Sequence, residues 1–336
     1  MVETIECGEI FPVADHGGGL DRAIALYGGR RNSWLDLSTG INPHFYPLPA
    51  IKLAAWRDLP DDLSLARLEA AARRAYGIVE EAAVATAPGS QALIQLFPRL
   101  LRPADVAILA PCYAEHARCW RLGGHRVREI ETLQAAKSGE VLVVVNPNNP
   151  DGRLIDPACL LDRVRQQQGL TIVDEAFADM IPAASLAGSI EPGLVVLRSF
   201  GKFYGLAGVR LGFALGDPVW IERLRAALGP WAVSGPALTV AAAALGDLGW
   251  AEAMRRRLDS EAQVLDALLA RAGLPVIGGT SLFRLARIEK AAGLAEHLAR
   301  HHIWVRSFLC YPDWLRFGLP PDDGARRRLA AALASR

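Results

Sequence analysis

The amino-acid sequence predicts an α/β protein built on a mostly parallel β-sheet. Through the middle of the chain, short apolar runs alternate with helical patterns, which is typical of strands joined by helical crossovers. The runs are apolar at nearly every position, as expected of strands that are buried on both faces. A length of 336 residues allows one large domain that carries a smaller one.

The predicted strands are the apolar runs at residues 106–109, 141–145, 170–173, 194–197 and 211–215. In three segments outside these strands, apolar residues recur at every third and fourth position, which indicates helices. These helical patterns cover residues 63–76, 91–101 and 157–167. Gly77 and Gly169 follow two of the patterns, and glycine commonly ends a helix.

The last third of the chain is predicted to form a small α+β domain. An amphipathic helix over residues 250–272 leads out of the sheet and ends before Gly273 and Pro275. After it we expect a strand, a helix and two short strands, at residues 281–286, 290–301, 304–307 and 314–318. The N-terminal segment is expected to complete this part. The predicted division is therefore a large domain of residues 45–245 and a small domain of residues 1–44 and 246–336.

The composition predicts a folded globular protein and does not favour a nucleic-acid-binding or membrane protein. Hydrophobic residues make up 51% of the chain, and 37 Lys and Arg balance 36 Asp and Glu. A balanced charge favours neither a nucleic-acid partner nor an acidic membrane surface. No apolar run reaches the roughly 18 residues that a membrane span needs. An anionic partner must therefore be recognised locally, by a few side chains.

Cysteine and histidine usage indicates a reduced compartment and no metal site. The five cysteines include no CxxC pair, and an odd number of cysteines cannot all pair in disulfides within one chain. The N-terminus lacks the basic start and apolar run of a signal peptide. Among the seven histidines, His297 and His301 have HxxxH spacing, but no Asp or Glu lies three or four residues from either of them to complete a metal site on the same helical face. We expect a cytoplasmic protein without a bound metal.

The polar residues that follow the predicted strands point to the functional site, because α/β sheets bind ligands beyond the carboxyl ends of their strands. Each segment alone has an ordinary explanation as a turn, a helix cap or a chance tetrapeptide. Their order and spacing together carry the prediction. The segments are Asn-Pro-Asn-Asn-Pro-Asp-Gly at 146–152, Asp-Glu at 174–175, Ser-Phe-Gly-Lys at 199–202 and Gly-Val-Arg-Leu-Gly at 208–212.

Together these four segments resemble the fold-type-I pyridoxal-phosphate enzymes of the class I and II aminotransferase family. The resemblance covers nearly the whole chain. It implies a large, mostly parallel sheet domain with a small α+β domain, and pyridoxal 5'-phosphate as the cofactor. It also implies a homodimer, because this fold builds its active sites near a dimer interface.

The resemblance assigns roles that simple chemistry supports. Lys202 is expected to hold the cofactor as a Schiff base and then to move a proton at the substrate's α-carbon. Asp174 is expected to pair with the pyridine nitrogen and keep it protonated, so that the ring accepts electrons. Asn149 would donate to the phenolic oxygen of the ring, and Tyr113 would stack on its face.

A second group of residues is expected to bind the cofactor phosphate. Gly89, Ser90 and Gln91 enter a predicted helix, and the backbone N–H groups at a helix start bind anions. Ser199 and Arg210 would complete this group. Arginine suits the task because its planar guanidinium pairs with two phosphate oxygens at once.

The N-terminal segment narrows the reaction. His16-Gly-Gly-Gly, followed by Ser-Thr-Gly-Ile-Asn-Pro at 38–43, resembles the threonine-phosphate decarboxylase branch of the family, which serves cobalamin synthesis. Phe177 supports this branch, since the related histidinol-phosphate aminotransferases usually carry Tyr there. The implied substrate is L-threonine O-3-phosphate, and the implied product is (R)-1-aminopropan-2-yl phosphate.

A substrate with a carboxylate and a phosphate needs at least two cationic anchors. Arg306 and Arg316 are the candidates, and either anion is open to each. Arg316 matches the position where relatives present the arginine for the substrate carboxylate. His16 could reach the substrate phosphate, and Gly40 and Asn42 complete the predicted substrate site.

Two residues depart from the family pattern. Leu59 lies near the position of a tyrosine that relatives extend to the cofactor phosphate of the neighbouring subunit, and Gly201 replaces Ser or Thr. We therefore expect weaker cofactor binding. One alternative function is amino transfer from histidinol phosphate or a similar amine. A second is a non-catalytic regulatory protein of the same fold, although such proteins usually carry a DNA-binding helical segment and none is seen before His16.

Overall fold

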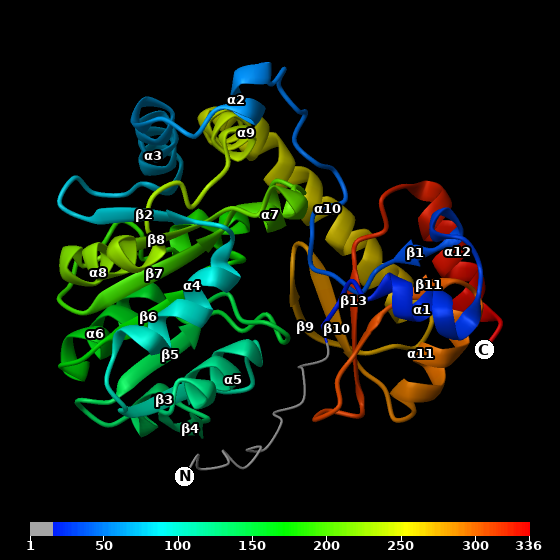
Figure 1. Ribbon diagram of the computed structural model, residues 1–336. Coiled ribbons are helices and arrows are strands. Elements are labelled where there is room, and N and C mark those ends of the chain that lie inside the picture. Colours follow the sequence, from blue (N-terminus) through cyan, green and yellow to red (C-terminus); the bar gives the residue numbers. More distant parts are fainter. Residues whose placement is uncertain (1–15) are drawn as a thin grey trace, which may run out of the picture.

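The computed structural model describes residues 16–336, which form a large sheet domain and a smaller part joined by the long helix α10 (Leu248–Arg271; Figure 1). The first fifteen residues of the predicted small domain, Cys7 among them, lie outside the described residues. Within residues 16–336 no helix is long and apolar enough to cross a membrane.

The large domain is built on a seven-stranded sheet in the order β2-β8-β7-β6-β5-β3-β4. β8 is antiparallel to both of its neighbours, and all other pairs are parallel. The α/β fold class predicted from the sequence is confirmed. The strands are β2 Ala83–Ala87, β3 Asp105–Leu109, β4 Arg126–Ile130, β5 Val141–Val145, β6 Thr171–Asp174, β7 Leu194–Ser199 and β8 Gly212–Gly216.

Helices cover both faces of this sheet, as the apolar strands require (Figure 1). The residues at alternate positions of each strand belong to two separate apolar clusters, one per face. One face packs against α3 (Asp62–Tyr76), α6 (Pro157–Gln167) and α9 (Gly235–Gly246). The other face packs against α4 (Ser90–Leu96), α5 (Glu115–Leu122) and α8 (Pro218–Leu228).

Local sequence signals set several helix ends. Asp61 precedes α3, and its carboxylate accepts a hydrogen bond from the Ser64 backbone N–H at 2.6 Å, which satisfies a helix-start donor. Asp156 does the same for Ala158 at the start of α6. Gly77 ends α3 with φ 65°, the left-handed conformation that glycine adopts without strain.

The smaller part contains an antiparallel sheet in the order β12-β13-β10-β9. The N-terminal segment joins this part, because β1 (Leu35–Asp36) pairs with β11 (Ile303–Trp304). The predicted division into domains of residues 45–245 and of residues 1–44 with 246–336 stays a prediction. The remaining elements are α1 Leu20–Tyr27, α2 Leu53–Arg57, α7 Phe200–Phe203, β9 Val276–Thr280, β10 Phe283–Arg287, α11 Ala291–Arg300, β12 Arg306–Ser307, β13 Trp314–Gly318 and α12 Asp323–Ala334.

The structure differs from the sequence prediction at several elements. The predicted helix 91–101 ends as an α-helix at Leu96 and continues as a 3₁₀ turn, Phe97–Leu100, because Pro98 has no N–H to donate. The predicted strand 304–307 divides into β11 and β12, which belong to different sheets. β2, β4 and β9 were not predicted, because small residues, charges and glycines respectively mask their strand patterns.

A buried ion pair network supports the strand ends that carry Asp174 and Ser199. The Arg198 guanidinium donates to Glu175 Oε2 at 2.9 Å and pairs with Asp179 Oδ1 at 3.0 Å. All three side chains are buried. Buried charges are tolerated only when they are paired, so this network fixes the residues next to the functional strand ends.

Replacing Arg198 with Met is therefore expected to lower the free energy of unfolding by about 3–5 kcal/mol, because two carboxylates would remain buried without a partner. The control is Arg165→Met, which removes an arginine paired with Glu191 at the surface and should cost no more than about 1 kcal/mol. Urea unfolding of both variants is the measurement. Equal losses in the two variants would contradict the assigned role.

Candidate functional site

A cavity of about 550 Å³ lies at the carboxyl ends of the central strands, where the large and small parts meet. Its walls come from the turns after β5, β6 and β7, from the starts of α4 and α5, and from β13 and the N-terminal segment. We call it the strand-end cavity. Twelve of the fourteen predicted site residues line it: His16, Gly40, Gly89, Ser90, Gln91, Tyr113, Asn149, Asp174, Ser199, Lys202, Arg210 and Arg316.

Lys202 lies on α7, the single helical turn that follows β7, and its side chain faces the strand-end cavity. Burial lowers the pKa of its amine to about 8, helped by the nearby Arg316 and Arg210 and opposed by Asp174. Its ammonium group lies 5.9 Å from the centre of the Phe177 ring. A substantial fraction of this amine is therefore neutral near physiological pH, and a neutral amine is a nucleophile.

Asp174 ends β6 and is buried. Its Oδ2 accepts a hydrogen bond from His116 Nε2 at 2.9 Å, and its Oδ1 accepts one from the Ala176 backbone N–H at 2.9 Å. These two donors hold the carboxylate in one orientation at the cavity wall. A fixed carboxylate in this position can hold a positive charge on a bound ring.

Tyr113 lines the cavity with its ring, and its hydroxyl donates to Gln91 Oε1 at 3.0 Å. Burial raises the pKa of this phenol above its ordinary value, and the neighbouring Glu115 and Asp174 add to the effect. Tyr113 therefore stays neutral. The ring supplies a flat apolar surface against which a planar ligand can stack.

Groups suited to binding an anion lie at the start of α4. Gly89 has φ 90°, and a Cβ there would lie 2.7 Å from Arg210 Nη2, so the arginine packs directly on the glycine backbone. Ser199 lies in the same wall. The Arg210 guanidinium is exposed and makes one hydrogen bond at 3.1 Å, to the Ala207 carbonyl. Backbone N–H groups, a hydroxyl and a guanidinium here suit a phosphate.

Gly201, which departs from the family pattern, has a packing explanation. A Cβ at this position would lie 2.6 Å from Ala207 Cα. A serine or threonine would therefore require the turn after α7 to move. The missing hydroxyl follows from this close backbone approach.

On the opposite wall, Arg316 reaches the cavity from β13. Its guanidinium donates to the Asn149 side-chain oxygen and to the Ser38 carbonyl at 2.9 Å. Burial lowers its pKa to about 9, and the neighbouring Arg306 contributes. Arg316 remains charged at neutral pH and forms a cationic wall facing Lys202.

Two predicted site residues do not line the cavity. Asn42 is buried; its amide donates to the Phe203 carbonyl at 2.8 Å and accepts from the His44 backbone N–H. It thus ties the N-terminal segment to the turn that carries Lys202. Arg306 pairs in register with Arg316 across β12 and β13, and its guanidinium lies over the Phe308 ring. Their predicted contacts with substrate stay predictions.

Three residues of α5 at or beside the cavity were not predicted from the sequence: Glu115, His116 and Arg118. Glu115 and Arg118 line the strand-end cavity, and His116 contacts Asp174. An acidic residue in a first helical turn is usually a solvent-exposed partner of the helix dipole, so Glu115 gave no distinct signal. The only available signal for His116 was its position three residues after Tyr113, which precedes α5 and was itself predicted to line the site.

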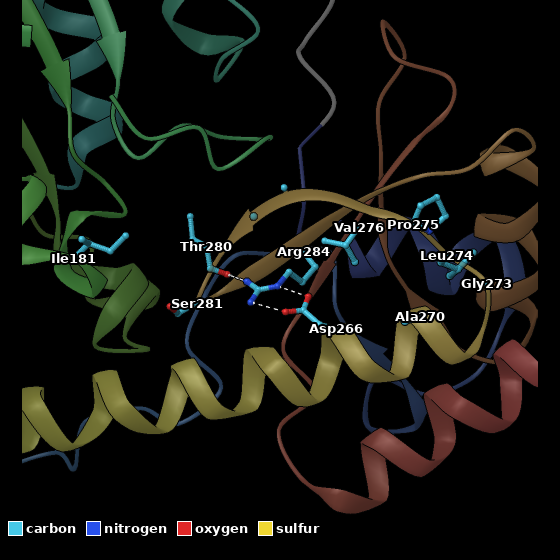
Figure 2. Close-up of a pocket in the computed structure, with 12 residues that line it drawn as sticks. Ile181, Asp266, Ala270, Gly273, Leu274, Pro275, Val276, Thr280, Ser281 and Arg284 are labelled. Atoms are coloured by element: carbon cyan, nitrogen blue, oxygen red, sulfur yellow. Dashed lines mark hydrogen bonds and ion pairs between the residues drawn. The ribbon is translucent and has the colours of Figure 1, made fainter. Parts of the chain in front are cut away.

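A wider cleft between α10 and the β9–β10 hairpin carries no comparable chemistry (Figure 2). The two charged residues in its wall bind each other, since Arg284 donates to both oxygens of Asp266. The same guanidinium also donates to the Thr280 carbonyl. With its charged groups paired, this cleft offers no free anchor for an ionic ligand, and the strand-end cavity is the candidate active site.

Comparison with known proteins agrees with this geometry. The family of class I and II aminotransferases matches residues 51–333. A threonine-phosphate decarboxylase of Pseudomonas aeruginosa is 48% identical, over 95% of this chain and 97% of that protein. One from a Sinorhizobium species is 46% identical, over 95% and 97%. The histidinol-phosphate aminotransferase of Sinorhizobium meliloti, solved with pyridoxal-5'-phosphate, shares the fold at 20% identity, with a TM-score of 0.81 over 100% of this chain and 97% of that one.

The lowered pKa of Lys202 predicts a specific pH dependence. The rate at which an acylating reagent labels this amine should rise through about pH 8, because only the neutral amine reacts. In Arg316→Ala the amine loses a positive neighbour, so its pKa rises and the labelling curve moves to higher pH. Peptide mass spectrometry over a pH series is the measurement. A curve centred at the ordinary lysine value of 10.5 in the unmodified protein would contradict this.

Proposed function

This chain belongs to the class I and II aminotransferase family, and within it we propose that the chain is a threonine-phosphate decarboxylase, a pyridoxal-phosphate-dependent lyase. The observation that carries the proposal is 48% identity over 95% of the chain with a protein of that name. The strand-end cavity supports it, since a partly neutral lysine, a fixed carboxylate and cationic walls surround one space.

The residues of the cavity fit pyridoxal 5'-phosphate. Lys202 would attach to its aldehyde, and Asp174 would pair with its ring nitrogen. The ring would stack on Tyr113. Its phosphate would bind the backbone at Gly89, together with Ser90, Gln91, Ser199 and Arg210. Asn149 faces the same space, where Arg316 holds its side-chain oxygen, which leaves its amide N–H₂ to donate.

When bound, the cofactor supplies an electron sink for the pair released at the substrate's α-carbon. The chain's own residues supply orientation and proton transfer. Lys202 would be placed to donate a proton to the substrate's α-carbon once the carboxylate has left as carbon dioxide. Asp174, which His116 holds in one orientation, would keep the ring nitrogen of the bound cofactor protonated.

The proposed substrate is L-threonine O-3-phosphate, and the proposed product is (R)-1-aminopropan-2-yl phosphate, for cobalamin synthesis. Two anions in one small molecule require cations on more than one side of the cavity. Arg316, with Arg306 behind it, provides one such side. His16 lies at another wall. The choice between losing the carboxylate and losing the α-hydrogen depends on which anion each side holds, because the bond that breaks must align with the ring's π system.

Purified enzyme loaded with pyridoxal phosphate is expected to release carbon dioxide from L-threonine O-3-phosphate without any added 2-oxo acid. Lys202→Ala should lower the rate by on the order of 10³-fold, because it removes both the cofactor attachment and the proton donor. Carbon dioxide release and product identification by mass spectrometry are the measurements. A product that forms only with 2-oxoglutarate would favour the histidinol-phosphate-type aminotransferase instead, and an unimpaired Lys202→Ala enzyme would contradict the catalytic assignment.

We further propose a homodimer. Six large apolar side chains between residues 45 and 63 are each more than half exposed: Phe45, Leu48, Leu53, Trp56, Leu59 and Leu63. Apolar side chains gathered along one segment are typical of a protein interface. The segment includes α2, which packs on α9 at the edge of the large domain (Figure 1). Leu59, where relatives carry a tyrosine for the neighbouring subunit, belongs to this segment.

Light scattering after gel filtration is expected to give a dimer for the unmodified protein and a larger monomer fraction for Trp56→Glu, because a charge in an apolar interface is costly to bury. Leu26→Glu is the matched control, since Leu26 is equally exposed but lies on α1 in the small part. It should leave the dimer intact. A monomeric unmodified protein, or equal loss of dimer in both variants, would refute the proposed interface.

A further inference from the structure

Glu115 is a buried carboxylate in the wall of a cavity that must take up anions. Its side chain is 5% exposed, and burying a carboxylate is costly unless donors surround it. His16 Nε2 donates to its Oε1 at 3.2 Å, and Gln91 Nε2 donates to its Oε2 at 3.0 Å. Arg118 Nη1 lies 3.5 Å from Oε2. The carboxylate therefore determines where these side chains point.

Gln91 connects the Glu115 carboxylate to Tyr113, the residue proposed to stack on the cofactor ring. Gln91 donates to Glu115 with its amide nitrogen and accepts from the Tyr113 hydroxyl with its oxygen. The Tyr113 and His16 rings lie 5.7 Å apart. Glu115 is thus bonded directly to His16 and, through Gln91, to the hydroxyl of Tyr113.

Residues 16–18 also connect Glu115 to the opposite, Arg316 side of the cavity. The Gly18 backbone N–H donates to Ser38 Oγ at 2.7 Å, and the Ser38 carbonyl accepts from Arg316. His16 therefore belongs to a strap of three residues, 16–18, that is held at one end by Ser38 of the small part and at the other by Glu115 of α5 in the large domain. Through these hydrogen bonds the strap links His16 to Arg316, the two residues proposed to bind the substrate's anions.

We propose that Glu115 is a positioning residue for the substrate phosphate: it orients His16 and Arg118 so that both can bind this group while Arg316 binds the carboxylate. With Nε2 of His16 directed at Glu115, the second ring nitrogen, Nδ1, is left to hydrogen-bond a phosphate oxygen. Arg118 has donor capacity to spare, because its Nε is buried without a partner and its contact with Glu115 is long. The inference rests on the proposed function, which supplies the phosphate-bearing substrate.

The test compares Glu115→Gln, His16→Gln and the double variant as pyridoxal-phosphate-loaded enzymes. The probe is O-phosphoethanolamine, which carries an amine and a phosphate but no carboxylate and so cannot be decarboxylated. Calorimetry should show on the order of tenfold weaker binding in each single variant, the effect of losing one charge-assisted hydrogen bond. The double variant should lose less binding than the product of the two single losses, because Glu115 acts in part through His16. With L-threonine O-3-phosphate, KM should rise while kcat changes little.

Glu222→Gln is the matched control, since Glu222 also pairs with an arginine three residues later but is exposed on α8. It should bind the probe normally. If Glu115→Gln folds poorly, Glu115→Asp, which withdraws the carboxylate by one methylene, should weaken binding in the same way.

Unchanged probe binding in a folded Glu115 variant would overturn the inference. The inference would also be overturned if the loss of probe affinity in the double variant equalled the product of the two single losses. A loss of cofactor affinity that accounts for the whole loss of probe binding would overturn it as well. Failure of the unmodified enzyme to release carbon dioxide from L-threonine O-3-phosphate would refute the proposed function separately, because the probe comparison does not depend on turnover.

Discussion

The interaction on which this site depends is the placement of one amine, that of Lys202, among charged groups in a partly buried space. Burial and two arginines lower its pKa to about 8, and Asp174 opposes them. The three charged neighbours come from three distant parts of the chain, at the end of β6, after α7 and in β13. The fold brings them together because parallel strands end at one edge of the sheet and the small part closes over that edge.

Much of the rest of the structure serves to hold these groups still. Asp174 is fixed by His116, and the strand ends on either side of it are tied by Arg198, Glu175 and Asp179. Arg316 is fixed by Asn149 and by the Ser38 carbonyl. The bonds from His116 to Asp174 and from Arg316 to Asn149 and Ser38 join residues at least 58 positions apart in sequence. The site is therefore a property of the whole fold rather than of any single motif.

The sequence was sufficient to predict the fold class and most of the residues that line the strand-end cavity, because these residues follow apolar strands in ordered motifs. It was insufficient where orientation decides the role. Gly40 and Asn42 belong to one motif, yet Gly40 lines the cavity while the Asn42 side chain binds backbone at Phe203 and His44. Glu115 and His116 were missed because the rotation of α5, which turns them inward, depends on tertiary packing. Edge strand β4 was missed because its exposed face is charged.

The central claim is that Lys202 carries the cofactor, and the chain's composition allows a direct test. The other three lysines, Lys52, Lys137 and Lys290, are exposed. Borohydride reduction of the protein incubated with pyridoxal phosphate, followed by peptide mapping, is predicted to place the reduced cofactor stoichiometrically on Lys202 and to remove a visible absorption band. Cofactor found on the exposed lysines instead, or no stable attachment at all, would contradict the account.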